Sequence, residues 1–192
     1  MKERAQIRII AGELRGRRLP CHVTEELRPT PDAVRQALFS ILGDAVPGRT
    51  FIDVFAGTGA VGVEAISRGA KSTTFVERDF EFANKIDKNL SDFRVAERGS
   101  VVRADVYRWA ERWRPHTDDP TNVFLSPPFA DLTRRVADFL ALVATLREKL
   151  PGGSTLTVQA ELGFPEEQLP GDGWDRRAYG RNLLFIWVRP LS

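Results

Sequence analysis

The chain has 192 residues, of which 42% are hydrophobic. It is therefore long enough for one domain with a full core and too apolar for a disordered protein. No apolar stretch approaches the length of a membrane span, and the residues up to Ile10 lack the apolar centre of a signal peptide. The single cysteine, Cys21, excludes an internal disulfide and argues against a zinc cluster. These features favour a cytoplasmic protein with no membrane partner.

The net charge is only +2, but basic side chains are concentrated at the N-terminus. Residues 1–20 hold six basic and two acidic side chains, which gives this segment a charge of +4. Apolar positions alternate with basic ones from 6 to 19, around Ala11-Gly12 and Arg15-Gly16, and this pattern predicts a β-hairpin. A basic hairpin on a nearly neutral body indicates contact with a polyanion, whereas a merely solvated hairpin is the alternative.

A link with two prolines follows the hairpin, from Leu27 to Asp32. Thr30 is expected to cap a helix that has Pro31 at its first position. Apolar residues then recur at helical spacing up to Leu42, and residues 43–49 are typical of a loop. The sequence thus predicts a basic hairpin extension over residues 1–28 and a larger domain over residues 29–192.

The larger domain alternates strand-like and helix-like segments. Strands are expected at 51–55, 72–76, 101–103, 122–125 and 154–159, with helices at 60–68, 80–91, 106–113 and 132–149. Such alternation predicts a mostly parallel sheet that helices cover on both faces. The last two strand-like runs, 174–179 and 183–188, have only three residues between them, so they are expected to form an antiparallel hairpin.

The segment from Thr50 to Gly62 combines a strand, a glycine turn and a helix start, a junction that usually holds a nucleotide-like ligand. Asp53 lies inside the apolar strand, where a carboxylate needs a partner. The turn Gly57-Thr58-Gly59 lets a ligand approach the backbone closely. Glu77 ends the next strand, where an acid can accept hydrogen bonds from both ribose hydroxyls, and Asp105 follows the third strand, where a carboxylate can meet an adenine amine.

The fourth strand ends in Ser126-Pro127-Pro128-Phe129. Adjacent prolines fix the backbone and remove two donors, so this turn offers only carbonyl oxygens. The Ser126 hydroxyl adds an acceptor and Phe129 adds a flat face, which together suit the exocyclic amine of a base. The glycine spacing alone also fits a nicotinamide-dependent oxidoreductase, but that class has no evident need for the proline turn.

Taken together, Asp53-x-Phe55-x-Gly57-Thr58-Gly59, the acid at position 77 and the Ser-Pro-Pro-Phe turn resemble the motifs of S-adenosylmethionine-dependent amino-methyltransferases. More narrowly, residues 7–19 and 27–39 resemble the RsmD type, and the resemblance extends from about Gln6 to Trp187. That family methylates guanine N2 in small-subunit (16S) ribosomal RNA.

The resemblance implies an α/β, Rossmann-like class I methyltransferase fold, with a seven-stranded, mostly parallel sheet and a C-terminal antiparallel hairpin. It implies S-adenosylmethionine as the cofactor, with S-adenosylhomocysteine as its product and no metal. The implied partner is ribosomal RNA, within a small ribosomal subunit or an assembly intermediate, and the implied oligomeric state is a monomer.

The resemblance also assigns residues to the site. It places the target amine at Ser126, Pro127, Pro128 and Phe129. It places the cofactor at Asp53, Phe55, Ala56, Gly57, Thr58, Gly59, Glu77, Arg78, Asp105 and Val106. RNA contacts are expected at Arg15, Arg17, Arg18, Arg28, Thr30 and Arg35.

One position departs from the family pattern. RsmD-like proteins usually carry Asp where this chain has Ser126, and a neutral hydroxyl accepts a weaker hydrogen bond than a carboxylate. Asp131 is a candidate stand-in carboxylate, although a cap of the following helix is the preferred interpretation. Two alternatives therefore remain open: an RNA-binding protein that holds the cofactor with weak or no catalysis, and an amino-methyltransferase for another nucleic-acid base.

Overall fold

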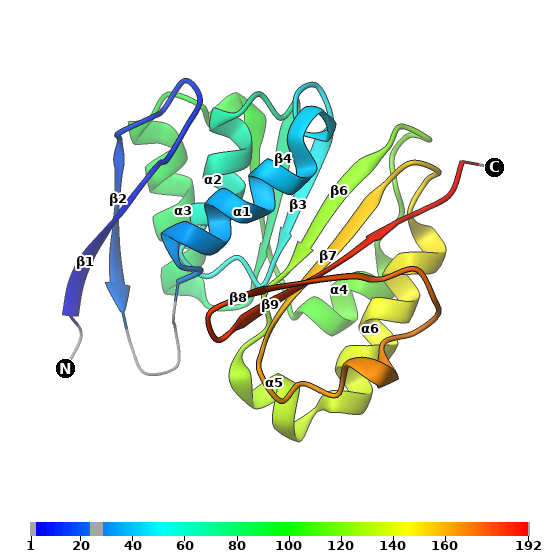
Figure 1. Cartoon of the computed structure of the whole chain (residues 1–192). Coiled ribbons are helices and arrows are strands. Elements are labelled where there is room, and N and C mark those ends of the chain that lie inside the picture. The colour runs from blue at the N-terminus through cyan, green and yellow to red at the C-terminus, as the bar shows by residue number, and fades with distance from the viewer. Residues whose placement is uncertain (1–2, 24–28, 192) are drawn as a thin grey trace.

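The computed structural model describes residues 3–23 and 29–191 (Figure 1). Within them the strands are β1 Glu3–Arg8, β2 Arg18–Val23, β3 Thr50–Val54, β4 Ser72–Glu77, β5 Gly99–Arg103, β6 Thr121–Leu125, β7 Thr155–Glu161, β8 Asp175–Tyr179 and β9 Asn182–Val188. The α-helices are α1 Asp32–Leu42, α2 Ala60–Ser67, α3 Phe80–Asp92, α4 Val106–Arg112, α5 Phe129–Arg134 and α6 Val136–Lys149. Short 3-10 helices lie at Gly43–Ala45, Ala96–Arg98 and Glu166–Gln168.

Strands β3 to β9 form one sheet in the order β5-β4-β3-β6-β7-β9-β8. β3 pairs in parallel with both β4 and β6, so the direction in which the chain adds strands reverses between β3 and β6. β9 is antiparallel to both β7 and β8. The expected α/β fold, with its seven-stranded, mostly parallel sheet and C-terminal hairpin, is therefore confirmed. Open sheets of this kind bind ligands at the point of reversal.

The alternation of side chains along β3 shows how the sheet is covered. Ile52 and Val54 pack in a core cluster with residues of α4 and α6, whereas Phe51 packs with residues of α1 and α2. Figure 1 shows these two pairs of helices on opposite sides of the sheet. Because successive side chains of a strand point to opposite faces, Asp53 shares the face of Phe51 and lies under α2.

The N-terminal hairpin forms a separate sheet of β1 and β2, in which Ile7 lies opposite Leu19. Ile9 and Leu19 are buried in one cluster with apolar residues of α2 and α3, and Figure 1 shows the hairpin beside these helices. A two-stranded ribbon is marginal alone, so this packing is what stabilises it. The expected boundary at residue 28 falls within residues 24–28, which lie outside the described part of the chain.

Two details of the helices differ from the expectation. The helix expected over 132–149 is divided into α5 and α6 at Arg135, whose φ of −127° leaves the helical region. The Arg135 guanidinium lies 4.1 Å from the ring centroid of Tyr107, and its Nε donates to Asp138 at 2.9 Å, so contacts on both sides hold the break. Thr30 is not the cap of α1, because Pro31 occupies the N-cap position and no side chain bonds there.

No helix within residues 3–23 and 29–191 combines the length and the apolar character that crossing a bilayer requires.

Candidate active site

A cleft of about 1020 Å³ lies at the carboxyl ends of the parallel strands. The ends of β3, β4, β6 and β7 line it together with the start of α4, the β8–β9 turn and the link before α1. Most of the residues assigned to the target amine and the cofactor meet there, as does Thr30. The predicted residues that line the cleft are Thr30, Asp53, Phe55, Ala56, Gly57, Thr58, Glu77, Arg78, Asp105, Val106, Ser126, Pro127, Pro128 and Phe129.

The loop after β3 is shaped by residues with positive φ. Phe55 has a φ of 63° and Gly59 a φ of 74°. A non-glycine residue in the left-handed region costs about 1 kcal/mol, and such strain gathers at ligand sites. A Cβ at Gly62, one turn into α2, would lie 2.2 Å from Phe75 Cε1, so α2 can approach the sheet this closely only with glycine there. The loop and the helix start are thus held tightly against β3 and β4.

Asp53 finds its partner in the helix above it. Its Oδ2 accepts a hydrogen bond from the Gly62 backbone N–H at 2.8 Å, and the side chain is only 2% exposed. Burial raises the pKa of this carboxyl to about 8; the Gly62 bond acts against this shift and the charge of Glu77 adds to it. Asp53 therefore ties the glycine loop and the start of α2 to the end of β3.

Glu77 braces the same loop from the neighbouring strand. Its Oε2 accepts from Gly57 N–H and its Oε1 accepts from Asp79 N–H, both at 2.8 Å. Each carboxylate oxygen has two lone pairs, so each keeps one for a further donor. The pair of oxygens at the edge of the cleft therefore fits the two adjacent hydroxyls of a ribose, as well as holding the loop.

Asp105 is the N-cap of α4. Its Oδ1 accepts from Tyr107 N–H at 3.1 Å and from Arg108 N–H at 3.2 Å. Within the described residues its Oδ2 has no partner, which leaves that oxygen available to an amine in the cleft. The cap explains why a carboxylate stands at this position, and the contact with an adenine amine stays a prediction.

The Ser126-Pro127-Pro128-Phe129 turn lies beside the glycine loop because β6 pairs with β3. The Ser126 N–H donates to Val54 O at 3.3 Å, which extends the pairing into the turn. Pro128 is the N-cap of α5, and Phe129 begins this helix with its side chain 63% exposed. The Phe129 ring is therefore free to stack on a planar group that enters the cleft.

The cleft also holds polar residues that were not singled out from the sequence, among them Gln159 on β7 and Arg181 and Asn182 at the β8–β9 turn. The Gln159 amide oxygen accepts from Thr30 Oγ1 at 2.9 Å and from Ser126 Oγ at 3.4 Å, and its amide nitrogen donates to Asn182 Oδ1 at 3.1 Å. Polar and apolar residues alternate along β7 from Thr155 to Glu161, so Gln159 does not stand out in the sequence, and it belongs to no contiguous motif.

Asp131 also differs from its preferred interpretation. It lies in the first turn of α5 and does not cap it, and its Oδ2 accepts a hydrogen bond from the Tyr107 hydroxyl at 2.6 Å. Burial is the main cause of a raised Tyr107 pKa, and the bond to Asp131 adds to it. The pair joins α4, beside Asp105, to the helix that begins with Phe129.

The basic residues of the hairpin lie outside the lining of the cleft. Arg15, Arg17 and Arg18 are exposed. The Arg17 guanidinium lies 4.8 Å from the centroid of the Phe93 ring and donates to Asp92 O at 3.1 Å. The expected RNA contacts of these arginines stay a prediction, and Arg28 lies outside the described residues.

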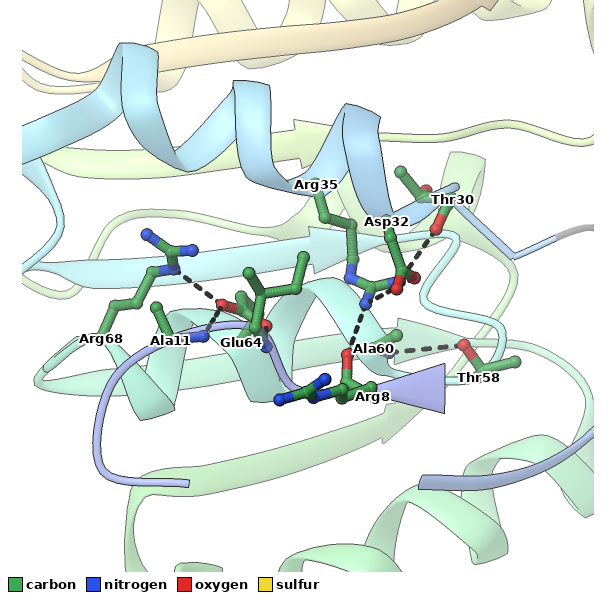
Figure 2. A network of polar contacts seen from close by, with 10 residues as sticks. Arg8, Ala11, Thr30, Asp32, Arg35, Thr58, Ala60, Glu64 and Arg68 are labelled. Atoms are coloured by element: carbon green, nitrogen blue, oxygen red, sulfur yellow. Dashed lines mark hydrogen bonds and ion pairs between the residues drawn. The ribbon is translucent and has the colours of Figure 1, made fainter. Parts of the chain in front are cut away.

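Arg35 was expected among the RNA-contacting residues, close to the pocket, but its complete burial argues against a direct contact with RNA. The residue has no exposed surface; its guanidinium donates to Thr30 O at 3.0 Å and to Arg8 O at 2.7 Å, and lies 3.1 Å from Asp32 (Figure 2). The side chain thus ties the end of β1 to the link before α1. Thr30 itself is buried and bonds to Gln159, so it lies at the edge of the cleft.

Glu64 on α2 holds the other end of the hairpin loop. Its two carboxylate oxygens accept from the N–H groups of Ile10 at 2.8 Å and Ala11 at 3.0 Å, and Arg68 pairs with it at 2.8 Å. Figure 2 shows that the Arg35 and Glu64 contacts follow one another along the segment that leaves β1, first at Arg8 and then at Ala11. Ser67 adds two more bonds, to Leu14 N and Ala11 O. The basic hairpin is therefore fastened to α1 and α2 through its backbone.

The model of a family described as "Conserved hypothetical protein 95" matches residues 7–185 of this chain. Two curated relatives are called "Ribosomal RNA small subunit methyltransferase D". The protein from Haemophilus influenzae is 40% identical over 129 residues, and the one from Escherichia coli K12 is 40% identical over 125 residues. These alignments cover 66% and 65% of this chain and 65% and 61% of the relatives, slightly less than two thirds of their length.

A solved structure described as a putative methyltransferase, yhhF, from Escherichia coli has the same fold with a TM-score of 0.78. It is 29% identical to this chain, and the superposition covers 98% of this chain and all of the other. Because the family model extends over nearly the whole chain, the resemblance seen in the sequence motifs is confirmed. The chain belongs to the family described as Conserved hypothetical protein 95, the RsmD type.

Proposed function

We propose that the protein transfers a methyl group from S-adenosylmethionine to the exocyclic N2 amine of a guanine in small-subunit ribosomal RNA. The observation that carries this proposal is the adjacency of the glycine loop and the Ser126–Phe129 turn, which β3 and β6 present side by side in one cleft. The relatives called ribosomal RNA small subunit methyltransferase D support the choice of RNA.

The cleft suits a nucleoside cofactor. Glu77 keeps one lone pair on each oxygen for the ribose, and Asp105 has a carboxylate oxygen to spare for the adenine amine. The loop over Gly57 and Gly59 brings the backbone close to whatever lies in the cleft. Asp53 holds that loop through Gly62. When bound, S-adenosylmethionine supplies a methyl group that its sulfonium has already activated.

The residues of the turn would act on the target base. Phe129 would stack on a guanine that has been turned out of its own stack. Ser126 Oγ and the Pro127 carbonyl would accept the N–H groups of the amine, which keeps the nitrogen lone pair from delocalising into the ring. Positioning of this kind supplies most of the rate when the donor is already reactive.

The exposed arginines of the hairpin would bind RNA phosphates and add a salt-dependent, sequence-independent part of the affinity. Their backbone is fastened to α1 and α2, so the base would be presented from a fixed direction. We further propose that the protein works as a cytoplasmic monomer on an assembling small subunit.

The proposal is tested by incubating the protein with labelled S-adenosylmethionine and small ribosomal subunits that lack the modification. The assay includes Ser126→Asp and, as a matched control, Ser40→Asp on the exposed side of α1. Label recovered as N2-methylguanine with the native protein supports the proposal. Label with Ser126→Asp alone favours a cofactor-binding RNA-binding protein without catalysis, and label with neither protein refutes the proposal.

A further inference from the structure

Gln159 forms the centre of a hydrogen-bond network that reaches Ser126 in the amine pocket, the part of the cleft formed by residues 126–129. It lies one residue beyond Val158, which pairs with Leu125, so it lies beside Ser126 across β6 and β7. Thr30 and Ser126 both direct their hydroxyl hydrogens to its amide oxygen, at 2.9 and 3.4 Å. All three residues line the cleft, and Gln159 lies outside the sequence motifs described above.

The contacts at both ends of the Gln159 amide share one orientation. Its amide nitrogen donates to Asn182 Oδ1 at 3.1 Å, while its oxygen accepts from Thr30 and Ser126. A carbonyl oxygen has two lone pairs, and two hydroxyl donors occupy them. The amide is therefore held as an acceptor toward Ser126.

This orientation decides what Ser126 can do. A hydroxyl has one hydrogen to donate and two lone pairs with which to accept. Once the hydrogen is directed to Gln159, only lone pairs remain to meet an N–H group of the target amine. Without that partner, the hydroxyl can turn its hydrogen toward the amine nitrogen and occupy the lone pair that must attack the methyl group.

We propose that Gln159 is a positioning residue that makes the Ser126 hydroxyl a hydrogen-bond acceptor for the target amine. The inference rests on the proposed methyl transfer. It explains how a neutral serine serves at a position where a carboxylate is an acceptor in every orientation. Gln159 does not touch the reacting atoms; it acts through Ser126.

The test is a double-mutant cycle of Gln159→Met and Ser126→Ala, with kcat and KM for RNA measured separately. Gln159→Met keeps the length of the side chain but removes the acceptor, and we expect kcat to fall about tenfold, which corresponds to one lost hydrogen bond, with KM changed less than about twofold. The kcat of Ser126→Ala should fall to a similar degree. The kcat of the double variant should be no lower than that of Ser126→Ala alone. Gln36→Met, the same change on the exposed side of α1, is the control for the substitution itself.

Gln159→Glu is the conservative rescue, because a carboxylate keeps acceptors for both hydroxyls and the Asn182 side-chain amide can turn so that its nitrogen donates to the new oxygen. Its kcat should stay within about threefold of the native value. Three results would overturn this inference while leaving the proposed methyl transfer intact, provided that the native protein transfers methyl. The first is a Gln159→Met variant with the native kcat, and the second is a double variant whose loss of kcat is the product of the two single losses. The third is a kcat of Gln159→Glu as low as that of Gln159→Met. Absence of transfer by the native protein overturns the proposed function and this inference with it.

Discussion

The buried carboxyl of Asp53 makes the stability of the protein depend on pH. Burial raises its pKa from 3.8 to about 8. Between these values the unfolded chain has lost this proton while the folded chain keeps it, so the free energy of unfolding falls as the pH rises. The slope from this group is about 1.4 kcal/mol per pH unit. It vanishes below pH 3.8 and above about pH 8, where both states carry the same charge.

Asp53→Asn removes the titration and keeps an amide oxygen that can accept from Gly62 N–H. Between pH 5 and pH 8 the native protein should lose about 4 kcal/mol of unfolding free energy relative to this variant. Urea unfolding of both proteins at the two pH values measures the difference, and any cost of burying the new amide cancels because it does not depend on pH. Asp44→Asn, at an exposed position after α1, should follow the native protein. Parallel curves for native protein and Asp53→Asn would refute the argument from burial.

Three further variants test the hairpin and the turn. Glu64→Gln leaves a single amide oxygen for two backbone N–H groups and Arg68. This change should lower the free energy of unfolding, measured by urea titration, by about 3 kcal/mol. A loss below about 1 kcal/mol would contradict the role of the carboxylate. Phe129→Ala should leave stability within about 0.5 kcal/mol, because the side chain is 63% exposed, but should slow methyl transfer about tenfold through lost stacking; unchanged transfer would argue against stacking. Replacing the exposed Arg15, Arg17 and Arg18 with alanine should weaken RNA binding in filter assays and reduce its salt slope by roughly 0.7 to 0.9 per lost phosphate contact. An unchanged slope would contradict the expected contacts of these arginines.

The fold was predictable because local patterns carry its main features. Parallel strands that are buried on both faces read as continuous apolar runs, and the helices between them keep an apolar face. The break between α5 and α6 was not predictable in the same way. Apolar spacing continues on both sides of Arg135, and the break depends on Tyr107, which lies on α4 and is distant in sequence.

The candidate site shows the same division. The glycine loop and the Ser126–Phe129 turn are contiguous motifs at strand ends, so topology alone brings them to one cleft. Gln159 was not predicted as a site residue because its role depends on hydrogen bonds with distant residues, such as Thr30, which is 129 residues away in sequence. Arg35 was predicted to contact RNA because an arginine near a basic segment suggests an exposed charge. In the structure its guanidinium instead meets two backbone carbonyls and Asp32.

The correction at Arg35 changes how the hairpin relates to the chemistry. Arg35 joins the Arg8 carbonyl, at the end of β1, to the Thr30 carbonyl. The Thr30 hydroxyl meets Gln159, and Gln159 meets Ser126. One run of hydrogen bonds therefore connects the basic hairpin with the amine pocket. Because these hydrogen bonds are buried or partly buried, the placement of the hairpin and the orientation of the Ser126 hydroxyl depend on the same contacts.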